Sequence, residues 1–193
     1  MINEFKNYLR SQTDLDEEGL QLVCRLAVPH KLRRNEFLLR EGEICRHKIF
    51  TVKGMLRTFG TTPDGGEHIL QFSAEQSWTL DVESYDMQVP AHCNISAVEP
   101  SEVLLWKKAD FDLLLATLPQ LKALAGQLIS RNIYKSRHRL LSTLSATPEQ
   151  KYEDFINDFP GLLPRLPLRM IASYLGISLK TLNRVRHTQL MRS

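Results

Sequence analysis

The chain has 193 residues, a formal net charge of +3 and 42% apolar residues. This length allows one large domain or two small ones, and the apolar fraction can supply a hydrophobic core. The first ten residues are charged and lack the apolar core of a secretory signal. No later stretch approaches the roughly 18 uncharged apolar residues of a membrane span. We therefore expect a cytoplasmic protein with no membrane partner.

The cysteines are few and scattered. Cys24, Cys45 and Cys93 are odd in number and include no C-x-x-C pair, which argues against a disulfide framework and a structural zinc site. His92 and Cys93 form the only adjacent pair of soft ligands, and zinc or iron needs more than two. We expect buried thiols, no metal and no cofactor.

Residues 1–30 are predicted to be helical, because apolar side chains recur near helical spacing from Phe5 to Ala27. Asp14 can cap a helix that begins near Leu15. These residues are predicted to form a small helical preface to the domain that follows.

Between Lys31 and Lys107 the pattern changes to short β-rich runs separated by glycine and proline turns. Regular turn signals of this kind predict antiparallel strands in a sandwich or roll. Residues 49–59 have the pattern of a hairpin whose turn is Lys53-Gly54.

The helical period returns at Ala109, and Pro119 should end or restart the helix. Residues 120–145 contain no proline, and a helix of this length would span about 39 Å. Its apolar stripe, led by Leu121, Leu124 and Leu128, is compatible with core packing, but the length favours an interface between two chains. Thr147 can cap the next helix, which should run to Phe159.

The segment 168–186 fits two short helices joined by a tight turn. Ala172 lets the helices approach closely, Gly176 accepts a positive φ in the turn, and Ser178 can cap the second helix. Pro167 can open the first helix. The positions where crossed helices must bury side chains are apolar: Ile171, Leu175, Ile177, Leu182 and Val185. This is the pattern of a DNA-reading helix-turn-helix.

Charge separates this segment from the rest of the chain. Residues 161–193 carry no Asp or Glu, and the other 160 residues carry a net charge of −3. Such asymmetry suggests a polyanionic partner such as DNA, although a pair of core helices with a solvated basic face remains an alternative. The cations of the segment are Arg165, Arg169, Lys180, Arg184, Arg186 and Arg192.

The order of β-roll, long helix and helix-turn-helix resembles the Crp/Fnr family of bacterial transcription regulators. Three pieces carry the resemblance: Arg40-Glu-Gly-Glu43, the run 49–54 (Ile-Phe-Thr-Val-Lys-Gly), and the run 171–177 (Ile-Ala-Ser-Tyr-Leu-Gly-Ile). The resemblance implies an α+β fold with an N-terminal antiparallel β-roll of the jelly-roll, cyclic-nucleotide-binding type. It places the sensor in residues 1–108, a short helix and a dimerisation helix in 109–146, and the DNA-binding domain in 147–193.

By the same resemblance the protein is a homodimer on double-stranded DNA, with RNA polymerase as a further partner. The two reading helices would then enter successive major grooves about 34 Å apart. The wing that is common in the family is expected to be absent or truncated.

The resemblance also implies a small effector held by the β-roll, lined here by Phe72, Glu75, Pro90, Ala91 and His92. Family members that bind cyclic AMP hold its phosphate with a glycine, a glutamate and a later arginine. Here alanine replaces that glycine, and the sequence has no arginine between positions 57 and 131. We therefore expect an unidentified effector other than cyclic AMP. A four-cysteine iron–sulfur cluster needs more thiols than the chain has, whereas haem sensing stays open.

Seven residues are predicted to contact DNA. Lys180 stands where family members often present an acidic residue, so the preferred DNA sequence should differ. The candidates for base edges or nearby phosphates are Ser178, Lys180, Thr181 and Asn183, and those for the phosphate backbone are Arg169, Arg184 and Arg186.

Two other classes of function are alternatives to a DNA-binding regulator. The first is an effector-sensing or protein-docking module whose terminal helices do not bind DNA. The second is a cupin-like enzyme, which needs a His-x-His and a nearby glutamate, whereas His47, His68 and His92 are isolated. The sequence therefore predicts a transcription regulator and no enzyme.

Overall fold

The computed structural model describes residues 1–190 and divides into two compact units. Unit 1 contains residues 1–61 and 70–129, and unit 2 contains residues 62–69 and the chain from 130 onward. These limits differ from the predicted domains in two respects. The short helix and the start of the long helix cluster with the β-roll, and the segment 62–69 clusters with the C-terminal helices.

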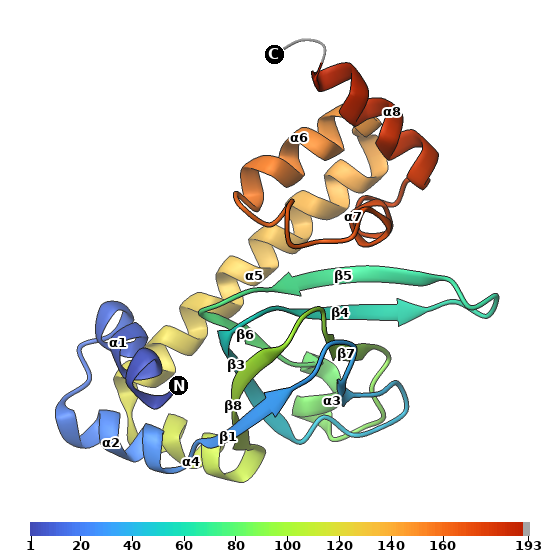
Figure 1. The fold of residues 1–193 in the computed structure, drawn as a ribbon. Coiled ribbons are helices and arrows are strands. Elements are labelled where there is room, and N and C mark those ends of the chain that lie inside the picture. Colours follow the sequence, from blue (N-terminus) through green and yellow to red (C-terminus); the bar gives the residue numbers. More distant parts are fainter. Residues whose placement is uncertain (191–193) are drawn as a thin grey trace. The chain divides into compact units, whose positions relative to one another are not determined.

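The elements follow the predicted order of helices, strands and helices (Figure 1). Unit 1 begins with α1 (Ile2–Gln12) and α2 (Glu17–Arg25). The strands are β1 (Val28–Leu32), β2 (Phe37–Leu39), β3 (His47–Lys53), β4 (Leu56–Thr61), β5 (Glu67–Ser73), β6 (Ser77–Thr79), β7 (Asn94–Ala97) and β8 (Ser101–Lys107). The later helices are α3 (Val82–Met87), α4 (Lys108–Thr117), α5 (Pro119–Ser145), α6 (Pro148–Asp158), α7 (Leu168–Leu175) and α8 (Leu179–Leu190).

The strands form two four-stranded sheets, in the orders β1-β8-β3-β6 and β2-β7-β4-β5. The pairings of β1, β3, β6 and β8 and those of β2, β4 and β7 are antiparallel, which confirms the predicted β-roll. The predicted hairpin over 49–59 is wrong, because β3 and β4 belong to different sheets. Gly54, at φ +88°, turns the chain from one sheet to the other.

Alternation along the strands separates two hydrophobic cores. Val103 and Ile49 lie in the core cluster that also contains Leu39, Leu56 and Ile95 from the opposite sheet. Their neighbours Leu104, Trp106 and Phe50 belong instead to the cluster shared with the helices. Successive side chains on a strand point to opposite faces, so one strand sequence serves both cores.

An aromatic cluster joins the helices of unit 1 to the outer face of the first sheet. The ring of Phe5 lies 4.8 Å from that of Phe50 and 5.0 Å from that of Trp106, centroid to centroid. The Trp106 indole N–H donates to the Val23 carbonyl at 2.9 Å. The cap of α2 is Asp16, which accepts from the Gly19 amide, and not the predicted Asp14.

The long helix α5 has the length expected from the sequence. Its first leucines, however, do not have the predicted role in an interface between two chains. Leu121 is 1% exposed and Leu124 is 3% exposed, and both lie in the core cluster with α1, α2 and α4. Leu128 packs partly buried against the same cluster. The prediction that Leu121 and Leu124 line the seam between two chains is therefore corrected, because their side chains are already covered within one chain.

Within residues 1–190, no single helix has both the length and the apolar composition of a membrane span. Only α4 and α5 taken together, across the bend between them, meet those criteria of length and composition.

Gly54 gives a direct test of the crossing between the sheets. An added Cβ would lie 2.6 Å from the Pro100 carbonyl oxygen and would also strike Ser101. Gly42 has nearly the same φ, +87°, with nothing within 4 Å of an added Cβ. We expect Gly42→Ala to lower the free energy of unfolding by about 1 kcal/mol through strain alone. We expect Gly54→Ala to lower it by about 3 kcal/mol or more, because overpacking adds to the strain.

Urea denaturation followed by tryptophan fluorescence measures both losses, since Trp78 and Trp106 lie in the core of unit 1. Equal losses for the two variants would contradict the close approach at Gly54.

Candidate nucleic-acid interface

A glycine turn sets the angle between α7 and α8. Gly176 adopts φ 64° and ψ 35°, the left-handed conformation predicted for it. The Ile177 amide donates to the Ala172 carbonyl at 3.1 Å, and the Gly176 amide donates to the Ser173 carbonyl at 3.3 Å. This pair of bonds ends α7 in a Schellman-type turn, so α8 starts in a fixed direction.

The buried faces of the two helices follow the predicted spacing. Ile171 and Leu182 are fully buried, Val185 and Ala172 are nearly so, and Leu175 is 6% exposed. Ile177 is only partly buried, because it lies in the turn. The α6 side chains Tyr152 and Phe155 are buried in the same unit. A three-helix core of α6, α7 and α8 therefore carries the helix-turn-helix.

Ser178 caps α8 as the sequence predicted, and the Thr181 amide is its donor, although the sequence also assigned both residues to DNA contact. The Ser178 Oγ accepts a hydrogen bond from the Thr181 amide at 3.0 Å, and the two hydroxyl oxygens lie 2.8 Å apart. A serine in this place satisfies one of the free amides at the start of a helix. Both residues therefore fix the beginning of α8.

The exposed face of α8 is polar and basic. Lys180, Asn183 and Arg184 are all exposed, and they are three and four residues apart. This spacing places them on one face of the helix, opposite Leu182 and Val185. His187 continues the same face one turn later and is also exposed. The sequence prediction did not include His187, although its position seven residues after Lys180 places it on the same face.

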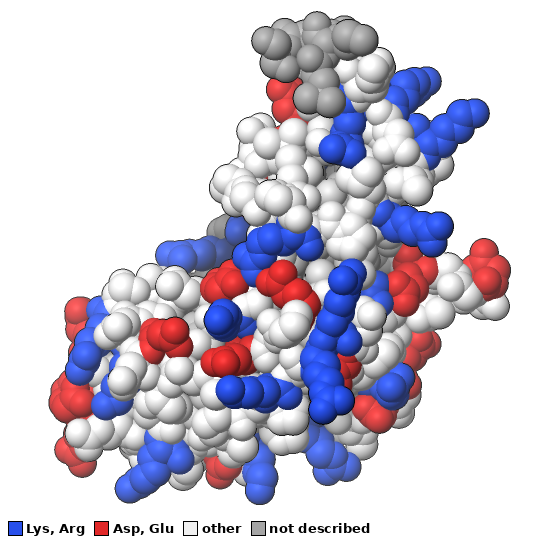
Figure 2. All heavy atoms as spheres, in the orientation of Figure 1, with Lys and Arg blue, Asp and Glu red and all other residues white. Residues whose placement is uncertain are grey.

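The remaining predicted contacts lie elsewhere in the unit. Arg169 is exposed at the start of α7, and Arg186 is partly buried on a side of α8 away from Lys180. Arg192 lies outside the described residues. Figure 2 shows Lys and Arg side chains projecting from the helices of unit 2. The structure thus brings Lys180, Asn183 and Arg184 together and separates Arg186 from them.

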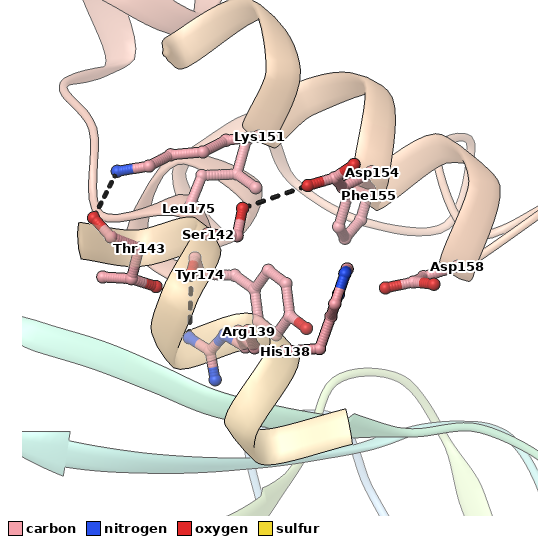
Figure 3. A pocket seen from close by; sticks show the side chains of 10 residues that line it. All are labelled: His138, Arg139, Ser142, Thr143, Lys151, Asp154, Phe155, Asp158, Tyr174 and Leu175. Carbon is pink, nitrogen blue, oxygen red and sulfur yellow. Dashed lines mark hydrogen bonds between the residues drawn. The ribbon is translucent and has the colours of Figure 1, made fainter. Parts of the chain in front are cut away.

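Behind the helix-turn-helix, α5 supports α7 through Arg139 and an aromatic cluster (Figure 3). The Arg139 guanidinium lies 4.0 Å from the centre of the Tyr174 ring and donates to the Tyr174 carbonyl at 2.9 Å. The rings of Phe155 and Phe159 each lie 5.6 Å from that of Tyr174. Burial lowers the pKa of Arg139 and raises the pKa of the Tyr174 hydroxyl, because both groups are partly withdrawn from water.

Comparisons with known proteins agree with this architecture. Residues 29–117 match the cyclic nucleotide-binding domain. Transcriptional activator protein FnrA of Stutzerimonas stutzeri is 28% identical over 186 residues, which cover 88% of this chain and 72% of that protein. The structure of FixK2 from Bradyrhizobium japonicum has a TM-score of 0.76 at 17% identity and covers 86% of this chain and 85% of its own.

A transcriptional regulator of the Crp/Fnr family from Eubacterium rectale has a TM-score of 0.72 at 14% identity, over 96% of this chain and 88% of its own. In sequence and in fold the chain is thus similar to transcription regulators of the Crp/Fnr type. FnrA is named as a transcriptional activator.

In this protein the predicted effector residues lie at two anchoring points of the β-roll. The exposed Glu75 accepts a hydrogen bond from the Gly54 amide at 2.9 Å, so its carboxylate holds the crossing between the sheets. Pro90 pairs with Ile44, and the Ala91 amide donates to the Glu43 carbonyl at 2.8 Å. Phe72 is buried and His92 is exposed.

The three thiols are free and buried, as the sequence predicted. Cys93 donates to an oxygen of the Asp81 carboxylate at 3.1 Å, and burial raises the pKa of this thiol well above its usual range. Within residues 1–190, no group of three or more His, Cys, Asp or Glu side chains has the arrangement of a metal site.

The cap at the start of α8 can be tested apart from DNA binding. Ser178→Ala removes the acceptor for the Thr181 amide, and we expect it to lower the local stability of α8 by about 1 kcal/mol. Ser178→Asp keeps an acceptor and should restore that stability. Hydrogen exchange of the Thr181 amide measures both effects.

Thr188→Ala is the matched control, because it removes a hydroxyl bond to the Arg184 carbonyl in the same helix. It should change stability by no more than about 0.5 kcal/mol. Equal effects of Ser178→Ala and Thr188→Ala would refute the capping role.

Proposed function

We propose that this protein regulates transcription as a homodimer that inserts α8 of each subunit into the major groove of duplex DNA. The observation that carries the proposal is the face of α8 formed by Lys180, Asn183, Arg184 and His187. It is exposed and without acidic residues, while the opposite face is buried in the three-helix core. A recognition helix needs both properties, since one face must fix its pose and the other must reach the DNA.

The contacts divide by chemistry and position. Lys180 and Asn183 stand near the start of α8, where a recognition helix meets base edges, and both can bond to bases in the major groove. Arg184 and Arg169 bind phosphates and set the register on the duplex. Ser178 and Thr181 act by holding the start of α8 in place.

The exposed apolar residues of α5 support a second copy of this chain as partner. Ile129, Ile133, Leu140 and Leu144 are 57%, 47%, 58% and 77% exposed. Their spacings of four, seven and four residues place them along one face of the helix. Gly126, where an added Cβ would meet nothing within 4 Å, extends the same face. Two such helices side by side would cover this face, which begins where the buried leucines end.

The β-roll would hold an unidentified small effector in the cytoplasm, where the duplex DNA is. Cyclic AMP does not fit the residues present, because Glu75 is bonded to the Gly54 amide and the sequence has no arginine between positions 57 and 131. RNA polymerase remains a partner that the family resemblance predicts.

The DNA contact is tested by Arg184→Ala. We expect it to weaken duplex binding about three- to tenfold for every sequence, and to reduce the slope of log K against log salt by about 1. Fluorescence anisotropy over a salt series measures both quantities. The exposed Lys122 on α5 provides the matched control, since Lys122→Ala removes one positive charge from unit 1. Absence of duplex binding by the wild type at low salt would refute the proposal.

Lys180 is tested by selecting bound duplexes from a random pool with the wild type and with Lys180→Glu. We expect the preferred base to change at one position in each half-site, because a carboxylate accepts from cytosine where an ammonium donates to guanine. A uniform loss of affinity with an unchanged preferred site would instead make Lys180 a phosphate contact.

The homodimer is tested by Leu140→Glu combined with Ile133→Glu. Placing carboxylates in the apolar face should convert a dimer of twice the chain mass into a monomer, and light scattering during gel filtration measures that mass. Leu113→Glu on α4 is the control, because Leu113 is as exposed as Leu140 and lies outside α5. A dimer that survives the double substitution would place the interface elsewhere.

A further inference from the structure

Residues 62–69, the segment that ends in the first residues of β5, are bonded to the helix-turn-helix. The Ser173 hydroxyl of α7 donates to the Glu67 carbonyl at 2.6 Å and accepts from the Ile69 amide at 3.0 Å. One side chain thus satisfies a donor and an acceptor of the segment's backbone, as a neighbouring strand would. Ile69 itself is 1% exposed.

Arg139 fastens the same segment from a second helix. Its guanidinium donates to the Ile69 carbonyl at 2.8 Å and to the Tyr174 carbonyl at 2.9 Å. Tyr174 lies in the last turn of α7, where helix carbonyls have no partner within the helix. Arg139 therefore ties the end of α7 and the segment together. The bonds of Ser173 and Arg139 to residues 67–69 are called the clip below.

The clip contacts the face of α7 that also carries Arg169, a predicted contact to the DNA backbone. Ser173 lies four residues after Arg169, so both are on one face of α7. The first helix of a helix-turn-helix crosses the DNA backbone. The segment 62–69 contains Asp64 and Glu67, both exposed, and no Lys or Arg. Figure 2 shows acidic side chains at the tip of the hairpin between β4 and β5.

We propose that the segment 62–69 is an autoinhibitory element that competes with DNA for the helix-turn-helix. While the clip is closed, an acidic segment is bonded to Ser173 on the face of α7 that also carries the exposed Arg169, and its carboxylates would repel a phosphate backbone there. The clip must open before the duplex can approach that face. This inference rests on the proposed DNA-binding function, to which it adds a regulatory contact.

Weakening the clip should change the affinity for DNA in one definite direction. When only the open form binds DNA, the apparent dissociation constant is the intrinsic constant divided by the open fraction. Removing the Ser173 hydroxyl deletes two hydrogen bonds that exist only in the closed form. The open fraction should therefore increase, and the affinity for duplex DNA should increase with it.

The test compares Ser173→Ala with Ser142→Ala. The Ser142 hydroxyl donates to the Asp154 carboxylate at 3.0 Å in the same unit and makes no part of the clip. We expect Ser173→Ala to bind duplex DNA about three- to tenfold more tightly than the wild type, and Ser142→Ala to bind equally well. Residue-resolved hydrogen exchange of the Ile69 amide reports the clip itself and should be faster in Ser173→Ala.

A second measurement needs no substitution. In the wild type, adding duplex DNA should speed exchange of the Ile69 amide, because binding selects the open clip. Unchanged or weaker binding by Ser173→Ala, or continued protection of Ile69 in the wild-type complex, would overturn the autoinhibitory role while leaving DNA binding intact. If wild type and both variants all fail to bind duplex at low salt, the proposed function fails and the inference fails with it.

Discussion

The crossing of α7 and α8 is the constraint on which the DNA-facing surface depends. Gly176 takes a left-handed backbone that residues with a Cβ reach only under strain, and this conformation sets the direction in which α8 leaves the turn. Leu182 and Val185 are then buried, which fixes the rotation of α8 about its own axis. Once that rotation is fixed, the opposite side of α8 must face the solvent. This side carries Lys180, Asn183 and Arg184. The reading face is a consequence of packing as much as of its own charges.

The helix α5 shows how one apolar stripe can be divided between two purposes. Its first turns bury Leu121 and Leu124 in the core of unit 1. Its later turns leave Ile133, Leu140 and Leu144 exposed, and Arg139 is withdrawn among Tyr174 and the carbonyls it binds. The same helix therefore contributes to a core, offers a face to a second chain and supports α7. A substitution in α5 will affect stability, assembly or the pose of α7 according to its position along the helix.

The segment 62–69 adds a contact of a different kind. It joins α7 through backbone groups that any sequence would offer, while the specificity comes from one hydroxyl and one guanidinium. Such bonds are individually modest, which suits a contact that has to open. A larger apolar contact would hold the segment more firmly and would leave less of the unit free to respond to DNA.

The sequence by itself determined the fold class, the order of the elements, the Thr147 cap and the helix-turn-helix, because these follow from local periodicity, capping side chains and glycine. It also indicated DNA as partner through the absence of acidic residues after position 160. Only the tertiary structure decided that β3 and β4 enter different sheets, that Leu121 and Leu124 are internal, and that His187 shares the reading face. It alone brought Ser173 and Arg139 to residues 67–69. The physical reason is that the local sequence pattern determines the conformation of each segment. Which distant segments come into contact depends instead on how the buried faces of all elements pack together.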